Sequence, residues 1–159
     1  MSLALTETEI AISQAQLAKI LSGVTPGAVL VGGQALAFWV TNYDVAMPKA
    51  LAGAISDDAD FLGSRADVTA IAKAARGIPT FASRNIITAL VGQVKIPVSS
   101  SEFVNVDVLH NLVGLDPEKV RNHAAEVTWR DVTFHVMHPL DVLQSRIENL
   151  AKLRSKQNE

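Results

Sequence analysis

Three carboxylates stand within four residues near the middle of the chain, at Asp57, Asp58 and Asp60, directly before an apolar pair. If residues 58–62 are extended, Asp58 and Asp60 point to one face of the strand and Asp57 points to the other. The Cα atoms of Asp58 and Asp60 would then lie about 6.5 to 7 Å apart, so both carboxylates can reach one hard cation. Two interpretations stay open at this point, a metal site and a solvated turn that leads into a strand.

A fourth aspartate, Asp107, interrupts an apolar run over 101–112 whose alternation is typical of a strand. An unpaired charge within a largely apolar strand is costly, so we expect this carboxylate to have a cation as its partner. Asp107 projects on the same face as Asn105. If this strand lies beside the one that carries Asp58 and Asp60, three carboxylates converge.

A glycine pair, Gly32 and Gly33, ends a short β-branched run over 27–31 and precedes residues that favour a helix. A glycine turn at a helix N-terminus lets backbone N–H groups approach a phosphate closely. The same pair also suits a plain tight turn, and both interpretations stay open.

Composition limits the classes of protein that fit. With 159 residues and 48% hydrophobic content, the chain suits one compact domain with its own core. Its 14 basic and 16 acidic residues give a formal charge of −2, so no overall field attracts nucleic acid or an anionic membrane. The sequence has no cysteine, so disulfides and thiolate zinc sites are excluded and a metal would bind oxygen or imidazole ligands.

Targeting signals are absent from the sequence. No apolar run approaches the roughly 18 to 20 residues that a membrane-spanning helix needs, and the first residues lack the regions of a signal peptide. We expect a cytoplasmic protein that does not enter the membrane, and a longer parent chain stays open.

Turn and capping signals predict the elements that position the aspartates. They indicate an α+β domain over 1–159 with N-terminal helices over 6–22, a core over 27–137 and a C-terminal helix over 139–156. The core should hold a mixed sheet of about five strands flanked by helices. Capping-box patterns at Thr6 and Ser13 support the first helices, and a tight hairpin is expected near Arg130.

The C-terminal helix carries an apolar stripe, which consists of Leu140, Leu143, Ile147 and Leu150. Arg146 flanks this stripe, and two hypotheses stay open for it: a side chain that reaches inward, or a solvated surface arginine.

Taken in order, the glycine turn and the aspartates resemble the nucleotidyltransferase superfamily that is related to DNA polymerase β. Its signature is a Gly-Gly or Gly-Ser turn that opens a helix, then Asp-x-Asp, then one Asp on a later strand. Gly32, Gly33, Asp58, Asp60 and Asp107 match it. The flanking residues look most similar to the small prokaryotic branch that includes abortive-infection toxin nucleotidyltransferases.

The resemblance implies a nucleotidyltransferase-like fold, a nucleoside triphosphate substrate and two Mg²⁺ or Mn²⁺ ions. It implies that Asp58 and Asp60 bridge the two ions at the triphosphate, and that Asp107 holds the ion that activates the acceptor hydroxyl. The acceptor would be RNA or protein, and an antitoxin-like partner is possible. Nucleotide binding would fall to the glycine turn with Gln34, and to Arg146 where such proteins often carry a lysine.

Two departures and two alternatives accompany this resemblance. The interval from Gly33 to Asp58 predicts an extended helix or an inserted loop over 43–56, and Gln34 stands where many members place a hydroxyl or a basic residue. One alternative is a catalytically silent nucleotide-binding or interaction module of the same fold. The other is a haloacid-dehalogenase-type phosphatase, whose Asp-x-Asp ends a hydrophobic first strand.

Overall fold

An eight-stranded mixed sheet organises the part of the chain that the structure describes, which is residues 6–46 and 57–157 of a computed structural model. The strands are β1 (Thr8–Glu9), β2 (Val29–Val31), β3 (Ala59–Leu62), β4 (Ile78–Phe81), β5 (Leu90–Pro97), β6 (Glu102–Leu109), β7 (Ala125–Trp129) and β8 (Val132–Val136). The helices are α1 (Gln14–Gly23), α2 (Gly32–Asn42), α4 (Arg65–Ala75), α5 (Pro117–His123) and α6 (Pro139–Gln157). The α+β class is confirmed, whereas the expected number of about five strands is too low.

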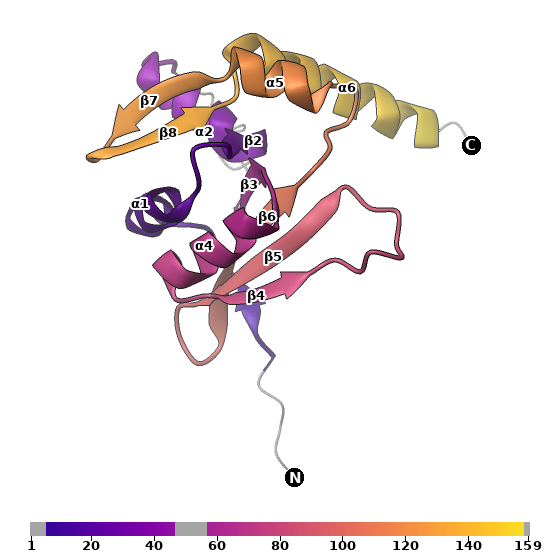
Figure 1. The fold of residues 1–159 in the computed structure, drawn as a ribbon. Helices are drawn as coiled ribbons and strands as arrows, with labels where there is room; N and C mark the ends of the chain where they lie inside the picture. The colour runs from indigo at the N-terminus through magenta and orange to yellow at the C-terminus, as the bar shows by residue number, and fades with distance from the viewer. Residues whose placement is uncertain (1–5, 47–56, 158–159) are drawn as a thin grey trace.

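The strand order places β3 and β6 side by side in the middle of the sheet. The order is β4-β5-β6-β3-β2-β8-β7, and β3 runs parallel to β6 but antiparallel to β2 (Figure 1). The short β1 pairs with the start of β6, at the part of that strand that β3 does not reach. The strands that carry the predicted metal ligands are therefore neighbours.

Alternation along β5 and β6 gives the sheet one apolar face and one polar face. Val94, Val104, Val106 and Val108 are fully buried, and α4 packs on this side with α1 beside it (Figure 1). The residues between them point to the other face and are only half-buried. This second face carries Asp107, so the apolar packing of β6 determines where the carboxylate points.

Several predicted elements are confirmed by the structure. The hairpin β7–β8 turns at Arg130 and Asp131, whose φ values of 49° and 62° are those of a two-residue turn that follows the twist of the strands. Ser13 and Gln16 form the predicted capping box at the start of α1.

The prediction of a helix at the very N-terminus is wrong. Thr8 and Glu9 form β1, because the first residues of β6 offer an open edge: the Thr8 N–H donates to Ser101 O, and the Ile10 N–H donates to Phe103 O. The sequence prediction also missed β4. The segment 47–56, which holds most of the predicted insertion, lies outside the described residues.

The C-terminal helix matches its predicted bounds, but its apolar stripe faces solvent. Each of the four stripe residues is more than half exposed, whereas the inward side carries the buried Val142 and the half-buried Arg146. None of the described helices is both long and apolar enough to cross a membrane.

Candidate metal centre

The pairing of β3 with β6 brings the predicted metal ligands together. In this parallel pair Asp60 stands directly beside Asp107, and paired residues of neighbouring strands share a face. Asp58 lies two residues before Asp60, just ahead of the strand, and its side chain comes to the same place. The convergence that the sequence left conditional is therefore present.

The three carboxylates could hold a metal ion. Each offers one oxygen, these oxygens lie within 4.8 Å of one another, and all three residues are half-buried. Oxygens that bind one Mg²⁺ at about 2.1 Å are at most about 4.2 Å apart, so the widest pair would need to close by only a few tenths of an ångström. Carboxylate oxygens are the ligands that Mg²⁺ and Mn²⁺ prefer. The geometry fits a hard divalent cation without selecting one.

Electrostatics at Asp60 show that this cluster carries more negative charge than its surroundings offset. Burial raises the pKa of Asp60 from 3.8 to about 7, and the charges of Asp58 and Asp107 raise it further, while Arg146 lowers it. A divalent cation at this point would remove the cause of the repulsion.

Asp107 is held in place by two side-chain amides. Gln93 Nε2 and Asn105 Nδ2 both donate to its Oδ1 atom, at 2.8 Å and 2.7 Å. Gln93 is the direct neighbour of Asp107 across β5–β6, and Asn105 precedes it by two residues on the same face. The amides fix the orientation of the carboxylate and satisfy one of its oxygens, whereas they donate nothing to the other.

Glu9 is a fourth carboxylate near the cluster, and it was not predicted. Partial burial raises its pKa, and so do the charges of Asp58, Asp107 and Asp57, in that order. The side chain reaches this position because β1 lies on β6 in line with β3. No sequence signal separates Glu9 from a helix-capping residue, since its role depends on a strand pairing with residues more than 90 positions away.

The glycine turn lies against Asp60, as the predicted grouping requires. Val31 pairs with Asp60 across β2–β3, and the next residue, Gly32, opens α2 with a φ of 64°. A Cβ atom added to Gly32 would lie 2.6 Å from Asp60 Oδ2, so any side chain at this position would collide with the carboxylate. No side chain caps the first turn of α2. Its N–H groups therefore point their partial positive charge beside the acidic cluster.

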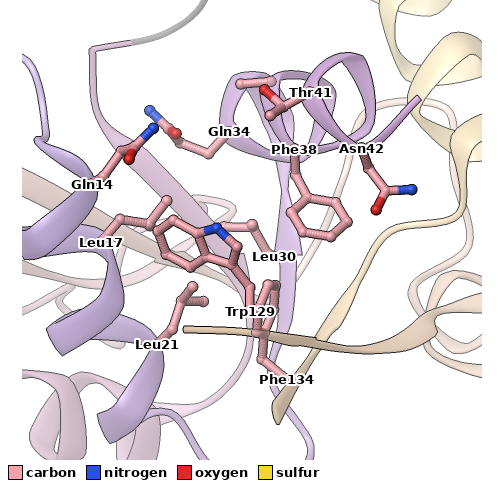
Figure 2. A pocket seen from close by; sticks show the side chains of 11 residues that line it. Gln14, Leu17, Leu21, Leu30, Gln34, Phe38, Thr41, Asn42, Trp129 and Phe134 are labelled. Atoms are coloured by element: carbon pink, nitrogen blue, oxygen red, sulfur yellow. The ribbon is translucent and has the colours of Figure 1, made fainter. Parts of the chain in front are cut away.

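Gln34 does not join the cluster. Residues two apart on a helix point in nearly opposite directions, and Gln34 faces away from Asp60 (Figure 2). Its side chain lies opposite Gln14 at the mouth of a separate cavity, between α1 and α2.

Arg146 reaches inward from α6, and a solvated surface position is not what the structure shows. The residue is half-buried, and its charge opposes the burial that raises the pKa of Asp60. Its Nη2 atom is buried and has no hydrogen-bond partner among the described residues. A buried guanidinium nitrogen without an acceptor suits an anionic ligand such as a phosphate.

Comparison with known proteins finds no match: no protein-family model, no curated protein and no solved structure matches this chain.

Proposed function

We propose that this chain is a metal-dependent nucleotidyltransferase that moves a nucleoside monophosphate from a nucleoside triphosphate to an acceptor hydroxyl in RNA or protein. The observation that supports this most strongly is the contact between the glycine turn and the carboxylates. Gly32 leaves no space between the first turn of α2 and Asp60. A phosphate-binding backbone and a set of hard-cation ligands therefore share one site.

The proposed roles follow the positions of the side chains. Asp58 and Asp60 would hold Mg²⁺ or Mn²⁺ beside the triphosphate, and Asp107, oriented by its two amide donors, would hold the ion on the acceptor side. Bound divalent ions supply stabilisation of phosphoryl charge and ease ionisation of a hydroxyl. In the reaction the acceptor oxygen bonds to the α-phosphorus, the bond from that phosphorus to the β-phosphate oxygen breaks, and pyrophosphate leaves with the electron pair.

Positive groups near the cluster suit the triphosphate. Arg146 brings a buried guanidinium toward Asp60, and the uncapped first turn of α2 brings backbone N–H groups to the same place. Each is able to donate to phosphate oxygens. The overall charge of −2 would not recruit a triphosphate, so these local donors carry the binding.

The phosphatase alternative fits this topology poorly. Its Asp-x-Asp would end a hydrophobic first strand, whereas Asp58 precedes β3 and Asp60 is the second residue of that strand. Two strands precede β3 along the chain, and one of them, β2, is its antiparallel neighbour.

The test separates an enzyme from a silent nucleotide-binding module. Each of the four labelled ribonucleoside triphosphates is incubated with Mg²⁺, total RNA or total protein, and the chain, and label incorporation is measured beside nucleotide affinity by calorimetry. We expect wild type to bind and to label, and Asp107→Ala to keep most of the affinity but to lose label transfer by several orders of magnitude.

The matched control is Asp57→Asn, which removes one exposed charge three residues before Asp60 and should leave both readouts unchanged. Wild type that binds nucleotide but labels no acceptor would support the silent module. Transfer by Asp107→Ala at the wild-type rate would show that the role given to this aspartate is wrong.

A further inference from the structure

A cavity of about 340 Å³ lies between α1, α2 and the hairpin β7–β8 (Figure 2). Its floor consists of the buried side chains Leu21, Leu30 and Phe134, and the half-buried rings of Phe38 and Trp129 flank it. Pockets that bind small molecules have volumes of about 300 to 1,000 Å³ and mostly apolar, aromatic walls with a few polar groups. This cavity has both properties.

The rings that form its walls are held in place by other contacts. The ring of Phe38 packs edge-on against Phe134, with centroids 5.7 Å apart, and also against Trp39 at 5.1 Å. Trp39 is anchored by its Nε1–H, which donates to Met137 O at 2.7 Å. A wall that is fixed in this way does not close over the space, so the cavity is preformed.

Polar groups gather at the mouth, and the nearest charge is positive. Gln14 and Gln34 face each other there, with the exposed Thr41 further along α2. Arg130 donates from Nη2 to Gln14 Oε1 at 2.7 Å, and its guanidinium lies 5.0 Å from the centre of the Trp129 ring. The lining itself includes no charged residue, and Arg130 forms no ion pair within the described part of the chain. A ligand with an anionic end would meet a cation and no carboxylate.

The cavity is separate from the carboxylate cluster. Leu30 lines it and pairs with Phe61, whereas the next residue along β2, Val31, pairs with Asp60. Consecutive strand residues point to opposite faces, so the cavity and the cluster lie on opposite sides of the sheet. The nucleotide of the proposed reaction would therefore not occupy this space.

The volume indicates the size of the occupant. A dry apolar cavity of about 150 Å³ is enough for benzene. A volume of about 340 Å³ therefore suits a molecule of two fused rings. We propose that this cavity is a second ligand site, which binds a planar two-ring aromatic carboxylate with the rings between Phe38 and Trp129 and the carboxylate at Arg130.

The test uses 2-naphthoate as the probe, 2-naphthamide as its uncharged counterpart, and both calorimetry and the NMR signals of the indole N–H groups. We expect saturable binding of 2-naphthoate with a shift of the Trp129 signal. Ala37→Leu places a larger side chain in the cavity wall and should weaken binding at least tenfold. Ala151→Leu, the same change at an exposed site on α6, should leave binding unchanged.

Two more variants keep the result clear. Thr41→Phe narrows the mouth from an exposed position and should also weaken binding, so the test does not depend on the folding of Ala37→Leu. Arg130→Gln should weaken 2-naphthoate several-fold and leave 2-naphthamide unchanged. Asp60→Asn should have no effect, since the carboxylate cluster lies across the sheet.

Four results would overturn the proposal. They are the absence of saturable binding below millimolar probe, equal affinity in wild type and Ala37→Leu, equal 2-naphthoate affinity in wild type and Arg130→Gln, and loss of binding in Asp60→Asn.

Discussion

Replacing Asp60 with asparagine should stabilise the metal-free protein at neutral and higher pH. Burial, together with the charges of Asp58 and Asp107, raises the pKa of Asp60 from 3.8 to about 7, so ionisation of this carboxyl is unfavourable in the folded state. At 1.36 kcal/mol per pKa unit, this rise corresponds to about 4 kcal/mol. Because Asp60 is only partly buried and solvent relaxes around it, we expect about 2 to 4 kcal/mol in practice.

The sign of the pH dependence follows from proton binding. Between about pH 4 and pH 7 the folded protein holds a proton on Asp60 that the unfolded chain releases. The contribution of Asp60 to stability is therefore complete below about pH 4 and is lost as the pH rises through about 7. Asp60→Asn removes this loss, so the variant and wild type should be equally stable near pH 4 and should differ most near pH 8. The raised pKa of Glu9 affects both proteins, and its listed charge partners do not include Asp60, so it cancels in the difference.

Urea unfolding in the presence of EDTA, at several values between about pH 4 and pH 8, measures this difference by linear extrapolation. Asp57→Asn is the control, because it removes an exposed charge from the same segment and should change the free energy of unfolding by less than about 0.5 kcal/mol. If Asp60→Asn were less stable than wild type near pH 8, the carboxylate would be stabilising the metal-free fold, with Arg146 as the obvious partner. The argument for an unsatisfied acidic cluster would then be wrong.

Three further predictions concern the metal, the glycine turn and the last helix. Millimolar Mg²⁺ or Mn²⁺ with a nucleoside triphosphate should raise the melting temperature of wild type but not of Asp60→Asn, since a ligand of the folded state stabilises it by mass action; an unchanged wild-type curve would count against the site. Gly32→Ala should lower the free energy of unfolding by about 2 kcal/mol in urea, from its positive φ and its contact with Asp60, whereas Gly27→Ala, whose Cβ meets no atom closer than 4.0 Å, should be nearly neutral; equal effects would contradict the steric argument. Val142→Ala should cost about 2 kcal/mol and Ile147→Gln less than about 0.5 kcal/mol in the same assay, because the first side chain is buried and the second is 57% exposed; the reverse order would show that the stripe of α6 is covered.

Part of the metal centre could be predicted from the sequence because its signals are local. Asp58 and Asp60 are two residues apart on a short strand, and Asp107 interrupts an apolar alternation, so strand geometry alone gives their faces. The spatial grouping was conditional, because no local signal says that β3 and β6 are neighbours. Their pairing is a property of the whole sheet.

The residues that the sequence prediction missed depend on long-range contacts. Gln93 supports Asp107 only through the register of β5 on β6, and Glu9 approaches the cluster only through the pairing of β1. Arg146 was left open because helical periodicity places it beside the apolar stripe. In the structure that stripe faces solvent, and the neighbouring side of α6 faces the protein. Periodicity identifies the faces of a helix but not which of them the rest of the chain covers.

The hydrophobic pattern of β6 links the core to the metal centre. Val104, Val106 and Val108 are fully exposed to the apolar side of the sheet and fully buried there, so a slip of one residue in the pairing of β6 would move all three toward solvent. The same slip would turn Asp107 into the apolar face and away from Asp60. The core therefore opposes every register that separates the carboxylates, and it can hold like charges together that would otherwise move apart. A cation bound at this point gains ligands whose convergence has already been enforced by burial of valine side chains.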